Sequence, residues 1–593
     1  MALFAPSQSP AVIVKEVDLT GGVPNVQTST GMYVGKFMWG PADERTLIAN
    51  EEELSETFGA PNNSHSVDYH DAAYFLRYSN TLQISRLVDS SANNAVSTTG
   101  QTSAYAVGTY TLPTVKNNEN FLVQQAALDS DGHTFIGRFP GSLANSLRVS
   151  ICPPSLNDSA FDGWTYKSSF DAAPSTSTFA SNNDGTNDEV HVAIVDVNGE
   201  FSGTKGTVLE TYPYLSVATN AVNADDGGNI YVKDVINTNS KYVHFVDFDS
   251  NFTNLGNAGT AITPGITKDF LGTAVQTSAV VNFAFDSGVD TGTLSTGNYL
   301  SGFDLFEDKD VVEIDFMIAP GMSSRADQTT VVNDLIAIAA SRKDCVVVSG
   351  PARTDIVNVN GDATITTNVV TTAETFTRSS YNIVAGNYLK VYDKYNDKFI
   401  DIPASSSLAG LMAETDRVAA PWFSPAGTRR GQLLGVTSLN YNPNKTRRDT
   451  LYKSGINPIV NLPGQGILLF GDKTGLSRPS AFDRINVRRL FLTLERAIER
   501  AAKNVLFEFN DEFTRAEFVN IIEPVLRDVK GRRGITDFRV IADETVNTAE
   551  VVDRNEFIAN ILIKPARSIN FITLNFVAVR TGVSFEEIAG QAF

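Results

Sequence analysis

Residues 311–351, VVEIDFMIAPGMSSRADQTTVVNDLIAIAASRKDCVVVSGP, decide the fold class of this chain. A β-prone run opens the stretch and a second one, CVVVSGP, closes it. Between them Val331, Leu335 and Ile338 recur at helical spacing, behind Ser and Asp residues that are able to cap a helix. The stretch therefore predicts strand, helix and strand, the β-α-β unit of an α/β sheet.

The same alternation returns nearer the N-terminus, in residues 31–90. GMYVGKF and TLQISRLVD indicate strands there, and NEEELSETFG and VDYHDAAYFLRYS indicate helices. Residues 91–302 differ, because Ser, Thr, Asn, Gly and Asp separate short β-prone runs such as KYVHFVDFD. Since the flanking segments share a fold type, we expect an all-β insert of one or two subdomains within a discontinuous α/β core, 22–90 and 303–420.

The C-terminal third, residues 421–593, is predicted to be a further α+β domain. Its clearest helix lies in DRINVRRLFLTLERAIERAAKNVLFEF. One face of that helix is apolar and is made by Val487, Leu490, Leu494, Ile498, Ala501 and Val505. Cationic side chains form a narrow stripe on the opposite side, and we expect them to point outward: Arg489, Arg496, Arg500 and Lys503. A capping-box pattern, Thr514 to Glu517, predicts the start of the next helix.

The first 21 residues contain one short β-prone run around Val12, Ile13 and Val14, bracketed by prolines and glycines. Neighbouring residues offer this strand no partner, and a lone strand is not stable in water. We therefore expect an N-terminal arm that pairs with a distant segment or with another chain.

Charge divides the sequence unevenly. The whole chain carries a net charge of −20, which argues against nucleic-acid binding. Residues 427–593, however, hold 24 Lys and Arg against 19 Asp and Glu, whereas residues 1–426 hold 23 against 48. Part of this excess is a cluster of five cations between Arg429 and Arg448, which is either a solvated face or a docking surface for an acidic partner.

Bulk composition indicates a folded, soluble protein. At 593 residues, with 42% hydrophobic and 19% charged residues, the chain has ample material for buried cores. No apolar stretch approaches the roughly 18 residues of a membrane span, and the N-terminus lacks a signal-peptide pattern, so no membrane insertion is expected. Cys152 and Cys345 match no ligand spacing and are predicted to be buried thiols.

The segment NLPGQGILLFGDKTGLS, residues 461–477, has two glycines at the spacing of a phosphate-binding loop. Asp472 stands where that loop requires lysine, and the spacer Ile467 to Phe470 is apolar. We therefore predict a buried strand shaped by Gly464, Gly466, Gly471 and Gly475.

Other patterns give no catalytic or metal site. His65 and His70 are five residues apart, one more than the spacing that places two imidazoles on one helix face. Asp543 and Glu544 follow a strand and are predicted to cap a turn together with Asn547. No Gly-x-Ser-x-Gly elbow is present. The sequence thus predicts no catalytic residue, no cofactor and no metal.

Long segments of the chain resemble the tail sheath proteins of contractile-tailed bacteriophages, in particular the T4-like branch. They include DIPASSSLAGLMAETDRVAAPWFSPAGTRRGQLLGV, SGINPIVNLPGQGILLFGDKTGLS and DRNEFIANILIKPARSINFITLNFVAVRTG. The resemblance covers about residues 1–90 and 303–593, and only patches of the segment between them.

This resemblance implies a structural subunit of the virion, assembled in the host cytoplasm, that forms stacked hexameric rings around a tail tube and contracts. Implied partners are other copies, the tail tube protein, and the baseplate and tail terminator proteins. The family's C-terminal domain faces the tube, so the cationic stripe is expected there. Terminal arms link subunits, which assigns strand pairing to Val12 to Val14 and to Phe571, Thr573 and Asn575.

Three alternatives stay open from sequence. The first is the sheath of a related contractile injection particle. The second is a P-loop-like nucleotide enzyme, and the third is a host-binding surface protein.

Overall fold

The computed structural model describes residues 29–99, 112–130, 133–183, 185–247 and 279–568. They form two compact units. One contains the described chain up to residue 421 together with 425–500, and the other contains 422–424 and the described chain from 501 onward. The sequence predicted a boundary at residue 421, whereas residues 425–500 group with the core, because they supply one of its strands.

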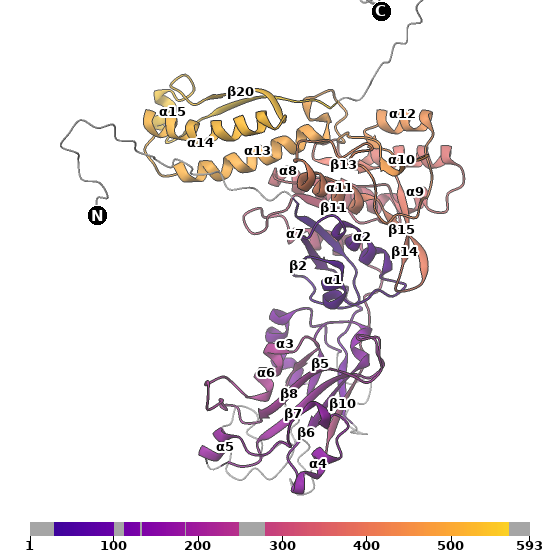
Figure 1. Ribbon diagram of the computed structural model, residues 1–593, viewed down its shortest axis with the longest axis vertical. Coiled ribbons are helices and arrows are strands. Elements are labelled where there is room, and N and C mark those ends of the chain that lie inside the picture. Colours follow the sequence, from indigo (N-terminus) through magenta and orange to yellow (C-terminus); the bar gives the residue numbers. More distant parts are fainter. Residues whose placement is uncertain (1–28, 100–111, 131–132, 184, 248–278, 569–593) are drawn as a thin grey trace, which may run out of the picture. The chain divides into compact units, whose positions relative to one another are not determined.

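A seven-stranded sheet organises the first unit (Figure 1). In spatial order its strands are β17 (Ile456–Asn457), β13 (Asn382–Ala385), β12 (Val346–Ser349), β11 (Phe316–Ile318), β1 (Gly31–Gly35), β3 (Leu82–Arg86) and β2 (Thr46–Ile48). All neighbours are parallel except β2 and β3. Gly31 pairs with Phe316, so strands from distant parts of the sequence lie side by side.

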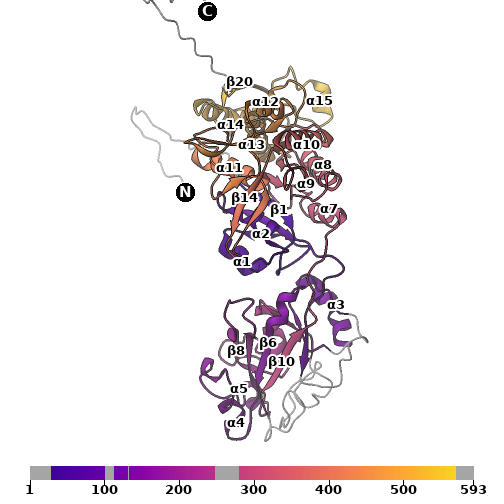
Figure 2. The same cartoon turned by 90° about the vertical axis from the view of Figure 1, so that its right-hand side faces the viewer.

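Helices cover both faces of this sheet, which is why most residues of its strands are buried. Val346 and Val348 belong to one hydrophobic cluster and Val347 to the other, as the period of two in a strand requires. The first cluster includes residues of α2 (Ser66–Leu76) and α11 (Ser405–Val418). The second includes residues of α7 (Thr296–Asp304), α8 (Arg325–Arg342) and α10 (Asp362–Thr375). Helices α8 and α10 contact each other and lie side by side in Figure 2.

The predicted β-α-β unit is confirmed as β11, α8 and β12. Helix α8 begins behind Ser324, whose hydroxyl accepts a hydrogen bond from the Asp327 amide. It ends at Lys343, which has a left-handed conformation. Two shorter helices also belong to the first compact unit, α1 (Glu51–Phe58) and α9 (Arg353–Ile356).

A second seven-stranded sheet, antiparallel throughout, lies in the segment between β3 and α7. In spatial order its strands are β8 (Thr207–Ser216), β7 (Glu189–Asp196), β6 (Leu147–Cys152), β10 (Val281–Asp286), β4 (Val96–Thr99), β5 (Phe135–Gly137) and β9 (Val243–Phe245). Asn93 and Val289 exchange backbone hydrogen bonds of 3.1 and 3.0 Å, so the chain enters and leaves this segment at one place.

The sequence predicted that this segment is all-β, and that prediction is wrong. It also contains the helices α3 (Asn118–Ser130), α4 (Ser159–Asp162), α5 (Thr178–Asn182) and α6 (Val232–Asn239). Apart from α3 they have at most eight residues, too few to produce a helical periodicity among polar and β-prone residues.

The rest of the first unit consists of short elements around the core. They are β14 (Tyr388–Asp393), β15 (Lys398–Pro403), β16 (Ser438–Leu439), α12 (Lys445–Lys453), β18 (Ile459–Leu462), β19 (Gly466–Leu469) and α13 (Ile485–Ala502). The strand predicted in 461–477 is confirmed as β19, which pairs with β18 in a hairpin. Gly464 and Gly466 have φ of 75° and 76°, so the hairpin turn needs residues without a side chain.

The second unit contains α14 (Glu512–Gly531), β20 (Ile535–Ile541), α15 (Ala549–Asp553) and β21 (Asn560–Pro565). Strands β20 and β21 pair antiparallel and α14 packs on β20. The cap of α14 is Asp511, which accepts from the Thr514 amide at 2.8 Å. The helix therefore begins before the predicted capping box. Val12 to Val14, Phe571, Thr573 and Asn575 lie outside the described residues.

Candidate functional site: the charge network around helix α13

The cationic stripe of α13 lies mainly inside the protein. Arg489 and Arg496 are 4% and 9% exposed, so the prediction that they point outward is wrong. The apolar side of the helix is also buried, with Leu490 at 1% and Leu494 at 2%. Protein therefore surrounds both sides of this helix, and its arginines have partners within the chain.

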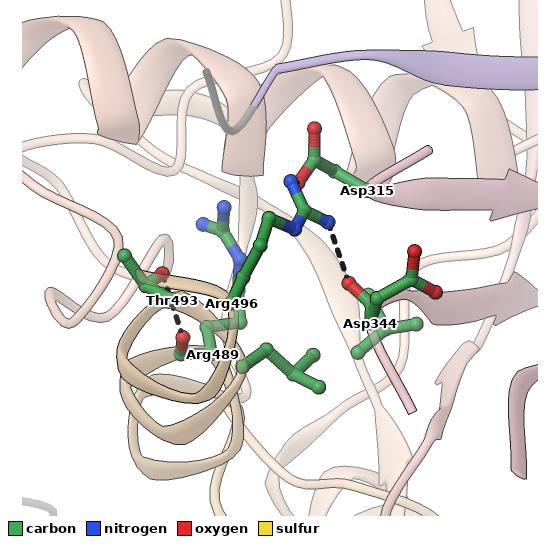
Figure 3. Close-up of a pocket in the computed structure, with 7 residues that line it drawn as sticks. Asp315, Asp344, Arg489, Thr493 and Arg496 are labelled. Carbon is green, nitrogen blue, oxygen red and sulfur yellow. Dashed lines mark hydrogen bonds and ion pairs between the residues drawn. The ribbon is translucent and has the colours of Figure 1, made fainter. Parts of the chain in front are cut away.

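Arg496 binds the amino ends of two neighbouring strands of the core sheet (Figure 3). Its Nη1 donates to Asp315 Oδ1 at 2.7 Å, just before β11. Its Nη2 donates to the carbonyl oxygens of Ile314 at 3.1 Å and Asp344 at 2.7 Å, the latter just before β12. Asp315 Oδ2 accepts from the Thr30 amide at 3.0 Å, at the start of β1. One ion pair thus links α13 to three adjacent strands.

Arg489 joins α13 to α11. It forms an ion pair with Asp416, donates to the Met412 carbonyl at 3.1 Å, and lies 4.9 Å above the centre of the Phe316 ring. The combination of carboxylate, carbonyl and aromatic face suits the planar guanidinium.

The outer end of the stripe is different. Arg500 is partly exposed and forms an ion pair with Glu313. Lys503 is exposed. Between the two buried arginines, the Thr493 hydroxyl donates to the Arg489 carbonyl oxygen at 2.9 Å (Figure 3).

Burial sets the protonation of the central pair. It raises the pKa of Asp315 to about 6, although Arg496 and the Thr30 amide both favour the charged carboxylate. Burial also disfavours the charged form of Arg496, but the Asp315 carboxylate outweighs it and the pKa of Arg496 is raised. At neutral pH both groups are therefore charged. The pair is a structural clamp in the interior, with Val346 and Leu492 as the apolar lining beside it.

The other candidate residues behave as structural groups. Asp472, at the position where a phosphate-binding loop has lysine, forms an ion pair with Arg484 at 2.9 Å and therefore serves the fold. His65 Nδ1 lies 2.7 Å from Asn62 Oδ1, and His70 Nδ1 lies 2.8 Å from the Ser66 carbonyl oxygen. Within the described residues no three His, Cys, Asp or Glu side chains form a group that could hold a metal ion.

Two smaller predictions are confirmed, the second of them for Asp543 and Asn547 but not for Glu544. Cys152 and Cys345 are buried free thiols. Asp543 Oδ1 accepts from the Thr545 amide at 3.0 Å, and Asn547 Nδ2 donates to the Ile558 carbonyl at 2.9 Å, so both residues stabilise the turn. In the part of the chain that the structure describes, no helix is long and apolar enough to cross a bilayer.

Sequence reasoning missed Arg86, which is only 1% exposed. Its guanidinium donates to the carbonyl oxygens of Phe37, Met38, Gly40 and Pro140 at 2.7 to 3.2 Å. It ties β3 of the core sheet to the segment that carries the antiparallel sheet. The available signal was a charged residue within a β-prone run of the sequence: Arg86 in TLQISRLVD and Asp315 in VVEIDFMIAPG.

These features define a mixed α/β protein with several sheets, in which buried ion pairs connect helices to strands. Residues 292–475 match the phage tail sheath protein central domain, and residues 477–578 match the phage tail sheath C-terminal domain. The tail sheath protein of Vibrio phage KVP40 is 33% identical, over 98% of this chain and 99% of the relative. That of Enterobacteria phage T4 is 30% identical, with the same coverage. The chain belongs to the tail sheath protein family.

A solved structure agrees at the level of the fold. The sheath tail protein from Listeria innocua aligns with a TM-score of 0.53, covering 92% of this chain and 93% of that protein at 12% sequence identity. The mixed α/β architecture with several sheets is therefore that of a sheath protein.

Proposed function

We propose that this chain is the sheath subunit of a contractile phage tail. Copies would stack as hexameric rings around the tail tube and, on contraction, drive the tube through the host envelope. The observation that carries the proposal is similarity to tail sheath proteins along 98% of the chain. The partners proposed with it are the tail tube, baseplate and tail terminator proteins, in a virion assembled in the host cytoplasm.

The roles proposed for the segments of the chain follow the family resemblance. The core consists of residues 22–90 and 303–420, extended by α7 and by residues 425–500, which pack on its sheet. Residues 91–302, apart from α7, are an outward-facing insert, and the region from residue 501 onward faces the tube. The shared entry and exit at Asn93 and Val289 supports an insert, because a closed loop tolerates added length at little entropic cost.

Terminal arms are proposed to link subunits through β20 and β21. These two strands pair only with each other among the described residues, and an isolated two-stranded sheet is marginally stable in water. Strands of a neighbouring copy, from residues 12–14 and 571–575, would extend it by main-chain hydrogen bonds.

The structure of α13 reduces the number of residues that can be proposed to contact the tube. Arg489 and Arg496 are engaged inside the subunit and offer no surface. Of the predicted stripe, only Arg500 and Lys503 lie where a partner could reach them, so a tube-facing role is proposed for these two alone.

Electron microscopy of the purified protein tests the function. We expect long tubes or contracted-like polysheaths above a critical concentration. A matched variant without residues 1–21 should give the same circular dichroism spectrum but no polymer, since its arm strand is missing. A parent protein that stays a discrete small oligomer at every concentration and salt tested would contradict the proposal.

A further inference from the structure

The positive charge of the C-terminal third is concentrated outside α13. Residues 427–484 contain nine Lys and Arg against three Asp and Glu, whereas residues 485–593 contain 15 against 16. Three of the four stripe residues also lie close to acidic partners: Asp416, Asp315 and Glu313. Net positive surface is therefore expected in the segment before the helix.

One cation of that segment lies against an exposed aromatic ring, and others are carried by elements next to it. Phe470 is 48% exposed, and the guanidinium carbon of Arg448 lies 5.5 Å from the centre of its ring. The loop carrying Arg429 is bonded to the same strand end, because the Gly427 amide donates to the Leu469 carbonyl at 2.9 Å. Lys445 lies on α12, one turn before Arg448. We call Arg429, Lys445, Arg448 and Phe470 the basic face.

The cations of the basic face are available to a partner. Arg429 and Lys445 are exposed, and in the described part of the chain neither forms an ion pair with an acidic side chain. Leu434, 50% exposed, adds apolar surface in a segment that borders β19 through the Gln432–Leu468 bridge. A protein-binding surface combines such an apolar centre with a charged rim.

The opposite edge of the same core sheet has the complementary character. There Leu47 of β2 is 52% exposed, and three exposed acidic residues lie close to it in sequence: Glu44 before the strand, and Glu52 and Glu56 on α1. Glu52 and Glu56 have no cationic partner among the described residues. The nearest cation in sequence, Arg45, donates to the Leu305 carbonyl at 2.6 Å. We call Leu47, Glu44, Glu52 and Glu56 the acidic edge.

The two surfaces are well separated on one subunit. The basic face adjoins β17, where α12 packs, and the acidic edge contains β2; these are the two outermost strands of the sheet. Six strand spacings of about 4.8 Å separate them by about 29 Å, more than three times the Debye length of about 8 Å at physiological salt. They cannot neutralise each other within one molecule.

We propose that the basic face of one subunit docks on the acidic edge of the next copy, as a lateral contact of the sheath. Different patches at the two ends make the interface heterologous, the type that generates rings and helices. Every added copy also brings one acidic edge for each basic face, so the stoichiometry balances at any polymer length. This inference rests on the proposed sheath function and names a surface for it.

Charge reversal tests the contact, using sedimentation and negative-stain microscopy of polymers formed by the full chain. The basic-face variant is Arg429→Glu with Lys445→Glu, and the acidic-edge variant is Glu52→Lys with Glu56→Lys. All four side chains lie at the surface, so folding should be retained, as circular dichroism will show. The matched control for the basic-face variant, Lys205→Glu with Lys241→Glu, makes the same charge change at exposed positions of the 91–302 segment.

Each charge-reversal variant alone should raise the critical concentration for polymerisation about tenfold, with a smaller effect at high salt, while the control behaves like the parent. A one-to-one mixture of the two variants should polymerise again, because one has two acidic surfaces and the other two basic ones. A single chain carrying all four changes should also polymerise.

Three results would overturn the proposal while leaving the sheath function intact. The folded variants could polymerise like the parent. Their mixture could fail to polymerise. The basic-face variant could form normal polysheaths and lose only the ability to assemble on tail tubes, which would assign the basic face to the tube protein. A parent that forms no polymer would instead refute the function itself.

Discussion

Replacing Arg496 by methionine removes the charge that links α13 to the core sheet while keeping most of the apolar stem. The Asp315 carboxylate then retains only the Thr30 amide, at 3.0 Å, and the carbonyls of Ile314 and Asp344 lose their donor. Both partners of the pair are about 90% buried. Removing one member of a buried pair typically costs about 3–5 kcal/mol. We expect about 3 kcal/mol, because Asp315 can take up a proton.

The pH dependence of this loss has a defined sign. The folded-state pKa of Asp315, about 6, lies above its unfolded value of 3.8, so the folded protein binds more protons between these values. Stability from this group is therefore highest at low pH and falls as pH rises. Without Arg496 the pKa rises further, so the deficit of the variant should be larger at pH 8 than at pH 5.

Urea unfolding of the protomer, followed by circular dichroism below the critical concentration, measures the effect. The matched control is Arg417→Met, since Arg417 is 71% exposed and pairs with Glu414 on the surface, a contact worth about 0–1 kcal/mol. In a double-mutant cycle, Asp315→Asn should recover part of the Arg496→Met loss, because the amide oxygen still accepts from Thr30 and no buried charge remains. A loss below about 0.5 kcal/mol at pH 8 would refute the buried pair, since that is typical of a surface substitution.

Three further predictions concern the rest of the fold. Gly410→Ala should cost about 1–3 kcal/mol in thermal unfolding, because a Cβ there would lie 2.4 Å from a Tyr78 ring carbon, whereas Gly531→Ala, with open space around it, should not destabilise. Burial lowers the pKa of His244 to about 3, so the unfolded state binds the extra proton and stability should fall as pH drops below 6.5. The variant His244→Phe should lose part of this pH dependence, measured as the difference between urea titrations at pH 5 and pH 7.5. An unchanged difference would contradict the assignment. Excision of residues 94–288 with a short linker should leave a core that unfolds cooperatively; loss of all structure would show that the core depends on the insert.

Local patterns were enough for much of the secondary structure. The β-α-β unit around α8 follows from apolar residues at helical spacing between two β-prone runs, and β19 follows from four apolar residues between glycines. Ser324 and Asp511 cap helices through hydrogen bonds to residues three positions on, so their effect is encoded within one turn. Long family segments likewise identified the class of protein from the sequence alone.

Only the tertiary structure decided which charges face water. Arg496 meets Asp315 across 181 positions of sequence, and Arg489 meets Asp416 across 73. Helical periodicity placed the cations on one side of α13 correctly, but it carries no information on what packs against that side. A guanidinium is stable either in water or in the interior, where a carboxylate and backbone carbonyls replace its hydration. Which of the two occurs depends on where strands that are distant in sequence end. The sequence therefore determined the stripe, and the packing of α13 on the amino ends of the strands determined that half of it is interior.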